Sequence, residues 1–190
     1  MGEERFGVIS SKIYSIGSSK AMKKFYSLIA NDVKGYGPRR ILDVGAGPGD
    51  LSIIMSKIIK NSEVYCVDPS RSMLKIANEK FRKLNMRNIN YKLGSSRDIP
   101  FKIKFDVILT SISFHHWKKK KESIAYLLSK LNKNGHLMIY EFYYDRLNFL
   151  QKITIGKHSL SLKEAKSYKF KGYKKNIEIK DKIIKVSFAK

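Results

Sequence analysis

The sequence predicts an α/β fold with three layers, built on a mainly parallel seven-stranded sheet with a C-terminal antiparallel β-hairpin. Short apolar runs that suit strands buried on both faces alternate with stripes of apolar residues at helical spacing. The first run, at residues 40–44, enters a helical pattern through a glycine-rich turn, GAGPG. Near the end of the chain, residues 176–180 and 183–188 alternate apolar and polar side chains around Lys180-Asp181-Lys182, which predicts the hairpin.

Each remaining element rests on a local pattern. Apolar runs predict strands at 41–44, 64–67, 89–93, 105–112 and 136–142, in addition to the two hairpin strands. Apolar residues at helical spacing predict helices across 22–33, 51–58, 73–84 and 124–131, and a short helix is expected near 161–170. Gly37-Pro38 and Asn134-Gly135 are expected to stop helices, and Ser70 to cap one. Residues 6–17 suggest a loop or short helix.

Length and composition bound the organisation of the chain. Its 190 residues, 43% of them hydrophobic, suffice for one substantial core and are few for two typical domains, so a single domain is expected. The only cysteine, Cys66, excludes an intrachain disulfide and favours a reducing compartment. No apolar run approaches the length of a membrane span, and the first residues lack the hydrophobic core of a signal peptide. We therefore expect a cytoplasmic protein.

The net charge of +23, from 39 basic and 16 acidic residues, is the unusual global property of this basic protein. It suits either a polyanionic partner such as RNA or a lysine-rich solvated surface. Lys118 to Lys121 form one run, and residues 151–190 carry twelve lysines against three acidic residues. The lysines rarely alternate with arginines and form no stripe interleaved with aromatic residues, which favours the solvated surface. RNA stays open as a partner.

The glycine turn between Val44 and Leu51 indicates a ligand-binding loop. Glycine lets the backbone approach a ligand closely, and the following helix start presents free N–H groups. The spacing is G-x-G-x-G, whereas the dinucleotide fingerprint is G-x-G-x-x-G. Asp43 and Asp50 flank the turn; two carboxylates would repel a pyrophosphate but suit a ligand with an ammonium and a sulfonium. The alternative is an ordinary strand-to-helix turn.

Asp68 is the strongest single candidate for a site residue. It ends the run at 64–67, where a parallel sheet places the ribose of a bound nucleoside, and its carboxylate can accept from both hydroxyls. Pro69 stops the strand behind it. The alternative is a strand-end Asx turn or a helix cap. Met73, in the next helix, is a core residue or touches the adenosine edge.

A resemblance to a known enzyme family covers three consecutive segments in the right order, which are the glycine turn, the strand end at Asp68 and residues 94–101. The glycine turn resembles motif I of the class I S-adenosylmethionine-dependent methyltransferases, and residues 94–101 resemble the segment of that family that follows its third strand. Residues 113–117, SFHHW, are similar to a strand end with a histidine pair in the type 11 group, with Trp117 in place of an aliphatic residue. The G-P-G-D-L loop and Glu141-Phe142 are similar to the quinone-biosynthesis C-methyltransferases.

The resemblance implies a Rossmann-like methyltransferase fold that binds S-adenosyl-L-methionine. It divides the chain into an N-terminal helical cover (1–39), a cofactor-binding core (40–142) and an acceptor-side segment with the hairpin (143–190). Ser95 stands where the family usually has the aspartate that accepts from the adenine amino group, and a serine accepts less strongly. The cofactor contacts that the resemblance implies are Asp43, Gly45, Ala46, Gly47 and Gly49 for the methionine portion, Asp68 with Pro69 for the ribose, Met73 at the adenosine edge, Ser95, Ser96 and Arg97 for the adenine, and Ser111 along the cofactor.

His115 and His116 are the candidate catalytic residues, because histidine titrates near neutral pH and both lie near the expected transfer point. One could be a general base, or both could form the pocket wall. The four histidines and one cysteine lack the spacing of a metal site, so no metal is expected.

Three functions remain open. The favoured function is methyl transfer to oxygen or carbon of a small molecule. The alternatives are an RNA- or ribosome-directed methyltransferase and a cofactor-binding module without turnover. The histidine segment does not resemble the Asn-Pro-Pro-Tyr signature, which argues against exocyclic amines and glutamine as acceptors. The acceptor and the oligomeric state do not follow from this sequence.

Overall fold

The computed structural model describes residues 19–190, which fall into two compact units with their boundary between Ser95 and Ser96. Each unit is described by itself below. The loop or short helix expected at 6–17 lies outside the described residues, as does the first part of the N-terminal cover. The single-domain organisation stays a prediction.

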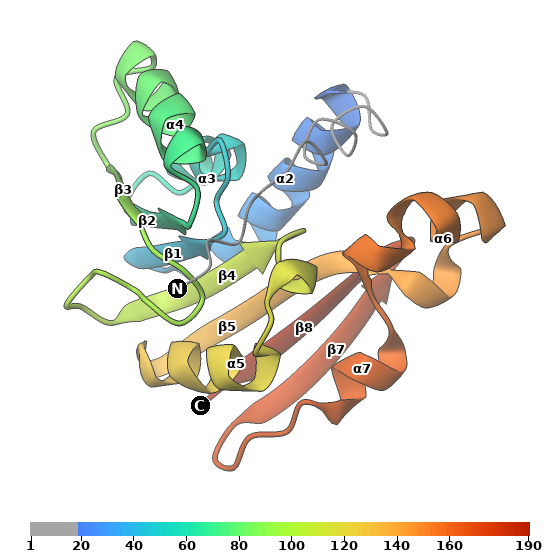
Figure 1. The fold of residues 1–190 in the computed structure, drawn as a ribbon. Coiled ribbons are helices and arrows are strands. Elements are labelled where there is room, and N and C mark those ends of the chain that lie inside the picture. Colours follow the sequence, from blue (N-terminus) through green and yellow to red (C-terminus); the bar gives the residue numbers. More distant parts are fainter. Residues whose placement is uncertain (1–18) are drawn as a thin grey trace. The chain divides into compact units, whose positions relative to one another are not determined.

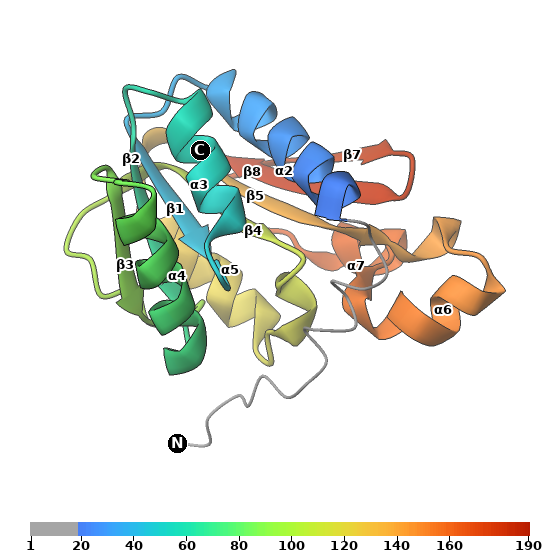
Figure 2. The same cartoon turned by 90° about the horizontal axis from the view of Figure 1, so that it is seen from above.

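Within residues 19–95, the N-terminal unit contains three parallel strands and three helices (Figure 1). The strands lie in the order β3-β2-β1, and Asp43 of β1 is in register with Cys66 of β2. Helices α3 and α4 lie beside these strands (Figure 2). All six elements confirm the predicted helices and strands of this half. Their bounds are α2 Ser19–Lys34, β1 Arg40–Val44, α3 Asp50–Ile58, β2 Glu63–Asp68, α4 Arg71–Lys83 and β3 Ile89–Leu93.

Local sequence explains the positions of these elements. The β1 and β2 strands are apolar along most of their length and buried there, as expected for strands covered on both faces. Helix α4 begins at Ser70, whose hydroxyl accepts the N–H of Met73 at 3.4 Å, so the predicted cap is confirmed. Ala77 and Phe81 of α4 pack with Ile53 of α3, which brings the start of α3 close to α4.

The C-terminal unit contains a mixed sheet in the order β4-β5-β8-β7, with a short strand, β6, pairing with β5 (Figure 1). Strands β4 and β5 are parallel, whereas β5, β8 and β7 are antiparallel neighbours. Across residues 19–190 the two units thus contain the seven predicted strands and the additional β6. The bounds are β4 Phe105–Ser111, η1 Phe114–His116, α5 Lys120–Ser129, β5 Leu131–Tyr143, η2 Tyr144–Arg146, α6 Phe149–Ile155, η3 Gly156–His158, β6 Ser159–Leu160, α7 Leu162–Ser167, β7 Lys174–Lys180 and β8 Ile183–Ala189.

The predicted helix stop at Asn134-Gly135 is wrong. Helix α5 ends at Ser129, and Leu131 already pairs with Phe105 in the parallel ladder. The register then shifts, so that His136 pairs with Val107, and Asn134 in the intervening bulge adopts a φ of 65°. The Asn-Gly pair therefore serves a bulge inside β5, because Leu131 is stabilised by strand pairing that local sequence does not reveal.

Helix α6 was not predicted. Its apolar residues Phe149, Leu150 and Ile153 are exposed, so they form no inward-facing stripe. The sequence signal was the capping box, in which Asn148 accepts from the N–H of Gln151 and the Gln151 side chain accepts from the N–H of Asn148.

The terminal hairpin confirms the prediction. Strands β7 and β8 are joined by Asp181 and Lys182, and β7 alternates exposed and half-buried residues along its length. None of the helices within residues 19–190 is both long and apolar enough to cross a lipid bilayer.

Candidate active site

The glycine loop of the N-terminal unit has a left-handed backbone at three positions. Gly45, Gly47 and Gly49 have φ values of 77°, 53° and 79°, a region that side chains with a Cβ adopt at a cost. The N–H groups of Gly45 and Ala46 donate to the carbonyl of Val67 at 2.8 and 3.1 Å. The loop is thereby folded against the end of β2, where Asp68 begins the next turn.

Two of these glycines differ in what surrounds them. A Cβ at Gly49 would lie 2.6 and 2.7 Å from ring atoms of Phe81, so this glycine permits the close packing of α3 on α4. A Cβ at Gly47 would meet no atom within 4 Å. Gly47 therefore leaves open space beside the backbone, as expected where a ligand approaches a loop.

Asp68 ties this loop to the start of α4. Its Oδ2 atom accepts the N–H of Gly47 and its Oδ1 atom accepts the N–H of Ser70, both at 2.9 Å. Its side chain is buried, and burial raises the pKa of Asp68 while the two backbone donors oppose the rise. The contact with Ser70 is the Asx turn that the sequence left open. The ribose contact stays a prediction.

Asp43 is more deeply buried than the sequence implied. Its Oδ2 atom accepts the hydroxyl of Ser52 at 2.6 Å, and the Sγ atom of Cys66 donates to Ser52 Oγ at 3.1 Å. Burial raises the pKa of Asp43 to about 7, with the Ser52 hydrogen bond opposing the rise and Asp68 adding to it. Asp43 therefore carries only part of its charge near neutral pH.

Asp50, the second flanking carboxylate, also differs from its expected role. The Nζ atom of Lys80 lies 2.7 Å from Asp50 Oδ1, so a cation from α4 already neighbours it. Asp50 is therefore not a free carboxylate beside the glycine turn, contrary to the expectation from the sequence.

Tyr91 is a loop contact that sequence reasoning missed. Its hydroxyl donates to the carbonyl of Gly47 at 2.6 Å from β3. Nothing in the local sequence around Tyr91 signals this contact, because it depends on the pairing of β3 with β2. The other candidates in this unit, Pro69, Met73 and Ser95, are half-buried.

Ser96, Arg97 and Ser111 belong to the C-terminal unit. The Ser96 hydroxyl is hydrogen-bonded to that of Ser123 at 2.8 Å, and Arg97 lies 3.9 Å from Glu122. Ser111 Oγ is buried at the end of β4 and has no hydrogen-bond partner in the part of the chain that the structure describes. A buried hydroxyl without a partner suits a residue that lines a ligand site.

The backbone after Ser111 is strained. Ile112 has a φ of 49°, which is rare for a β-branched residue, and its N–H donates to the carbonyl of Tyr140 at 2.9 Å. Such strain clusters at functional sites. It turns the chain from β4 into η1, which contains both candidate histidines.

His115 is held by a buried carboxylate. Glu141 is fully buried in β5, and its Oε1 atom accepts the backbone N–H of His115 at 3.2 Å. Its Oε2 atom lies 3.1 Å from His115 Nδ1. Because a carboxylate only accepts, Nδ1 carries the donated proton, and Nε2 of a neutral His115 is left as an acceptor. That Nε2 atom lies 2.9 Å from His116 Nε2.

His158 joins this pair from η3, although the sequence places it far from His115 and His116. Its ring centroid lies 4.7 Å from that of His115 and 5.6 Å from that of His116. Three of the four histidines therefore lie together, although their spacing in the sequence does not indicate it. Sequence spacing gave no signal, because the pairing of β6 with β5 brings η3 to η1.

The expectation that His116 titrates near neutral pH is also wrong. Burial, followed by the neighbouring His115 and His158, lowers the pKa of His116 to about 4. Burial and His115 lower the pKa of His158 as well. The His116 ring is therefore largely neutral near pH 7 and is a weak base.

Comparisons with known proteins agree with the sequence resemblance. Residues 41–135 match the family model described as a methyltransferase domain. A ubiquinone/menaquinone biosynthesis C-methyltransferase UbiE of Shewanella pealeana is 30% identical over 175 residues, which cover 85% of this chain and 68% of that protein. An uncharacterized methyltransferase of Staphylococcus carnosus is 33% identical over 130 residues, covering 67% and 59%. The UbiE of Wigglesworthia glossinidia brevipalpis is 36% identical over 118 residues, covering 60% and 47%, so the chain spans about half of these last two relatives.

Solved structures confirm the predicted fold class. The plantazolicin methyltransferase BpumL, in complex with a monoazolic desmethylPZN analog and SAH, superposes with a TM-score of 0.78 at 18% identity, covering 96% of this chain and 88% of that one. The YcgJ protein of Bacillus subtilis gives a TM-score of 0.67 at 16% identity, covering 87% and 97%. The family model covers half of the chain, and the Shewanella pealeana relative matches 85% of it. These two matches identify the chain as a member of the class I S-adenosylmethionine-dependent methyltransferase family, in the group that contains the ubiquinone/menaquinone biosynthesis C-methyltransferases.

Proposed function

We propose that this chain is an S-adenosyl-L-methionine-dependent methyltransferase that transfers a methyl group to oxygen or carbon of a small-molecule acceptor. The observation that carries the proposal is the glycine loop, in which Gly47 faces open space while Asp68 and Tyr91 hold its amide and its carbonyl. The residues present fit the cofactor, because a backbone without a Cβ offers close approach to the methionine portion. The bound cofactor supplies the methyl group from its sulfonium.

The chain's own residues bind and position the cofactor. The loop from Gly45 to Gly49 holds the methionine portion, and Asp68 accepts from the ribose. The roles that the family resemblance gives to Ser95, Ser96, Arg97 and Ser111 are part of the same proposal. Because the sulfonium leaves as a neutral thioether, the protein contributes mainly orientation and exclusion of water. A strong base is required only for acceptors that must lose a proton first.

The names of the relatives support a small-molecule acceptor. The Shewanella pealeana and Wigglesworthia glossinidia relatives are C-methyltransferases of ubiquinone and menaquinone biosynthesis, and BpumL is a plantazolicin methyltransferase. We infer an acceptor with a hydroxyl or an acidic carbon on this basis. We also infer a cytoplasmic setting from Cys66, which is buried and without a disulfide.

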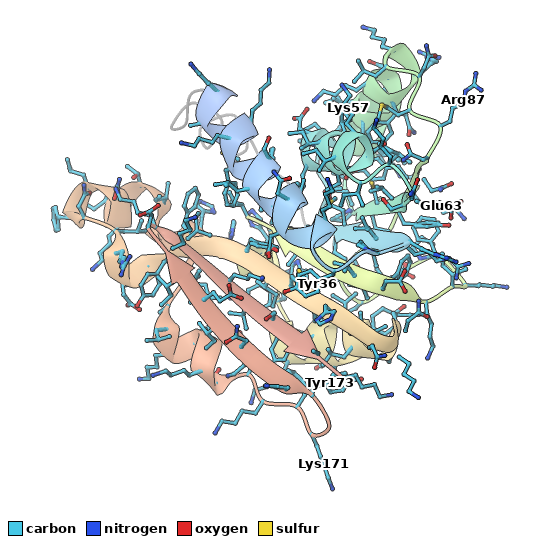
Figure 3. All side chains as sticks on the ribbon, turned by 180° about the vertical axis from the view of Figure 1, so that it is seen from behind. Tyr36, Lys57, Glu63, Arg87, Lys171 and Tyr173 are labelled. Atoms are coloured by element: carbon cyan, nitrogen blue, oxygen red, sulfur yellow. The ribbon has the colours of Figure 1, made fainter. Side chains whose placement is uncertain are left out.

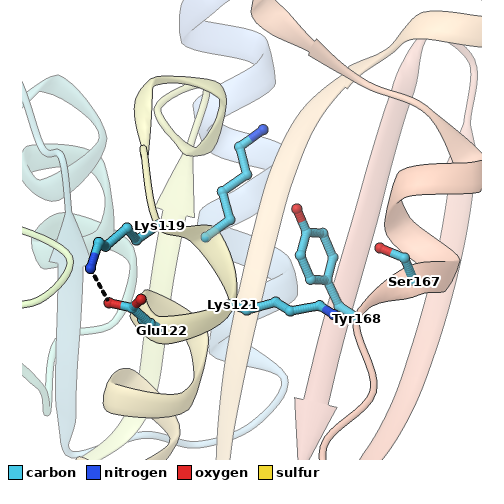
Figure 4. A pocket seen from close by; sticks show the side chains of 6 residues that line it. Lys119, Lys121, Glu122, Ser167 and Tyr168 are labelled. Atoms are coloured by element: carbon cyan, nitrogen blue, oxygen red, sulfur yellow. Dashed lines mark ion pairs between the residues drawn. The ribbon is translucent and has the colours of Figure 1, made fainter.

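The charge of +23 keeps RNA as a second candidate acceptor, but the lysine run contributes less than its sequence suggests. Lys119 lies 3.2 Å from Glu122, and Lys120 lies 2.8 Å from Glu164 and 5.1 Å from the centre of the Phe114 ring. Figure 4 shows Lys119 directed at Glu122 and Lys121 beside Tyr168 in the pocket that these residues line. Two of the four cations are therefore paired within the chain.

Other basic residues point into solvent from separate turns. Arg87 and Lys171 are exposed and extend away from the ribbon of their own units (Figure 3). In the hairpin, Lys185 is buried and lies 3.3 Å from Glu178, and Lys175 donates to the carbonyls of Ala165 and Lys166. These pairings favour the small-molecule acceptor over RNA.

Two measurements test the proposed function. Calorimetry with the full chain is expected to show binding of S-adenosylmethionine and of its demethylated product, and none of nicotinamide dinucleotides. Radioactive cofactor is then incubated with mixtures of phenols, quinols and acidic carbon compounds, or with RNA. Label in a small molecule supports the proposal, label in RNA replaces it with the second candidate, and binding without any labelled product favours a non-catalytic module.

A further inference from the structure

We propose that His115, His116 and His158 form a binding site for a divalent first-row transition ion, with Zn²⁺ as the reference ion. One ring nitrogen from each histidine can be chosen so that all three lie within 4.8 Å of one another. All three residues belong to the C-terminal unit, in η1 and η3, so the site does not depend on the position of the other unit. No role for His158 follows from the family resemblance.

The distances fit a three-nitrogen centre after a small adjustment. Zinc–nitrogen bonds of about 2.0–2.1 Å place the ligand atoms of a tetrahedral site about 3.3–3.4 Å apart. The Nε2 atoms of His115 and His116 are 2.9 Å apart, so they have to separate by about 0.5 Å to reach that spacing. The two ligand nitrogens that are farthest apart are separated by no more than 4.8 Å. They have to approach each other by about 1.5 Å at most to reach the tetrahedral spacing. His158, in a short 3₁₀ segment, is the ring placed to move.

Glu141 supplies the support that metal-binding histidines commonly have. A ligating histidine usually donates its second ring N–H to a carboxylate, which fixes its tautomer and orientation. Glu141 makes this contact with His115 Nδ1 and also accepts the backbone N–H of His115. The carboxylate has no exposed surface, so the arrangement is built into the core. The contact between Glu141 and His115 Nδ1 leaves the other ring nitrogen of His115, Nε2, directed at His116.

The cluster also contains an unsatisfied atom. His158 Nδ1 is buried, and no hydrogen-bond partner for it exists among residues 19–190. A buried polar atom without a partner costs free energy that a metal bond would offset. A hydrogen bond between His115 and His116 would by itself also explain why these two rings lie close together, without a metal ion.

Three neutral nitrogens leave a fourth coordination position for an oxygen donor, as in catalytic zinc sites. If the proposed function holds, that position suits a hydroxyl of the acceptor, whose pKa a divalent ion lowers. Metal binding itself is independent of the proposed function, and it is measured without cofactor.

The test is a titration of the untagged full chain, freed of metal by a chelator, with Zn²⁺ in a calorimeter and with Co²⁺ by visible absorption. We expect one ion per chain and a Co²⁺ spectrum of tetrahedral type. His116→Ala and His158→Ala should each weaken Zn²⁺ binding by about a hundredfold or more, and Glu141→Gln by about 10- to 100-fold. His136→Ala is the matched control, because His136 pairs with Ala189 and is not one of the three clustered histidines.

Circular dichroism shows whether each variant is folded. If the His116→Ala variant in η1 is unfolded, the His158→Ala variant decides the outcome. The proposal is overturned by absence of stoichiometric binding in the wild-type chain. It is equally overturned if His158→Ala binds Zn²⁺ as tightly as the wild type, or if His136→Ala loses binding to the same extent. Calorimetry of S-adenosylmethionine with the same variants separates failure of the metal site from failure of the methyltransferase assignment.

Discussion

Asp68 holds the backbone of Gly47 in place, with its Oδ2 atom 2.9 Å from the Gly47 nitrogen. The same carboxylate accepts from Ser70, so one side chain connects the glycine loop to the start of α4. We predict that Asp68→Ala weakens S-adenosylmethionine binding by about 1.5–3 kcal/mol, the usual cost of losing hydrogen bonds to a charged group. Calorimetry measures the affinity. Unchanged affinity in this variant would remove Asp68 from the proposed site.

The stability of Asp68→Ala should fall as well, because two backbone N–H groups lose a buried acceptor. Each unsatisfied donor costs about 1–3 kcal/mol, less where water enters. Asp68→Asn keeps one acceptor oxygen, so we expect it to lose less stability than Asp68→Ala. Urea unfolding of both variants measures the difference, and equal losses would contradict the two contacts.

Gly47 and Gly172 form a matched pair for separating ligand binding from folding. Both have positive φ values, 53° and 81°, and an added Cβ meets nothing within 4 Å at either position. An alanine should therefore destabilise the chain by a similar amount at both sites, about 1–2 kcal/mol. We expect only Gly47→Ala to weaken cofactor binding, because its methyl group fills the space beside the loop. Equal cofactor affinity in the two variants would argue against a ligand at Gly47.

Gly49→Ala has a different expected outcome. It combines the positive φ with a contact of 2.6 Å to the buried Phe81 ring. The ring is held in the core with Ala77 and Ile53, so relief of the contact requires repacking. We predict a loss of stability larger than that of Gly47→Ala by about 1–3 kcal/mol, the usual cost of overpacking. Thermal or urea unfolding of the two variants tests the order.

The sequence predicted the strands, the glycine loop and the hairpin because each of these has a local pattern. Helix α6 has such a signal in Asn148 and Gln151, but its exposed apolar residues hide the usual helical stripe. The bulge at Asn134 could not be predicted, because it follows from the pairing of Leu131 with Phe105. Secondary structure that depends on distant partners leaves little trace in a short window.

The same reason limits prediction of the site. Asp68 follows a strand and precedes a proline, so its position was visible in the sequence. Tyr91, Glu141 and His158 acquire their contacts only when neighbouring strands and connecting segments pair. Burial also altered the chemistry, since the pKa of Asp43 rises and that of His116 falls. Residue type and spacing alone do not carry that information.

RNA binding provides a test of the surface charge. We predict weak binding whose affinity falls with salt on a log–log slope of less than about four, as for a basic protein without a dedicated RNA site. Lys118 and Lys121 are changed to glutamine, which leaves the ion pairs of Lys119 and Lys120 intact. The control is Lys57→Gln with Arg87→Gln, which removes equal charge from the other unit. A steep slope that only the first variant reduces would support an RNA acceptor.

Asp43 should make stability depend on pH across a defined window. Its pKa is about 7 in the folded chain against 3.8 for an ordinary aspartate, so the folded state holds a proton that the unfolded state releases between these values. The stability that Asp43 contributes is therefore complete below about pH 4 and is lost as pH rises towards 7. At about 1.4 kcal/mol for each pH unit, the total change is on the order of 4 kcal/mol.

The measurement compares urea unfolding of the wild type and Asp43→Asn from pH 4 to pH 8, because the other titrating groups then cancel. The wild type should lose stability relative to Asp43→Asn as the pH rises, and a constant difference would show that Asp43 is ionised throughout. Ser52→Ala sharpens the test. The Ser52 hydroxyl donates to Asp43 Oδ2 at 2.6 Å and holds the pKa of Asp43 down. Without the Ser52 hydroxyl the pKa of Asp43 rises further. The loss of stability caused by ionisation of Asp43 should therefore continue to a higher pH in Ser52→Ala than in the wild type.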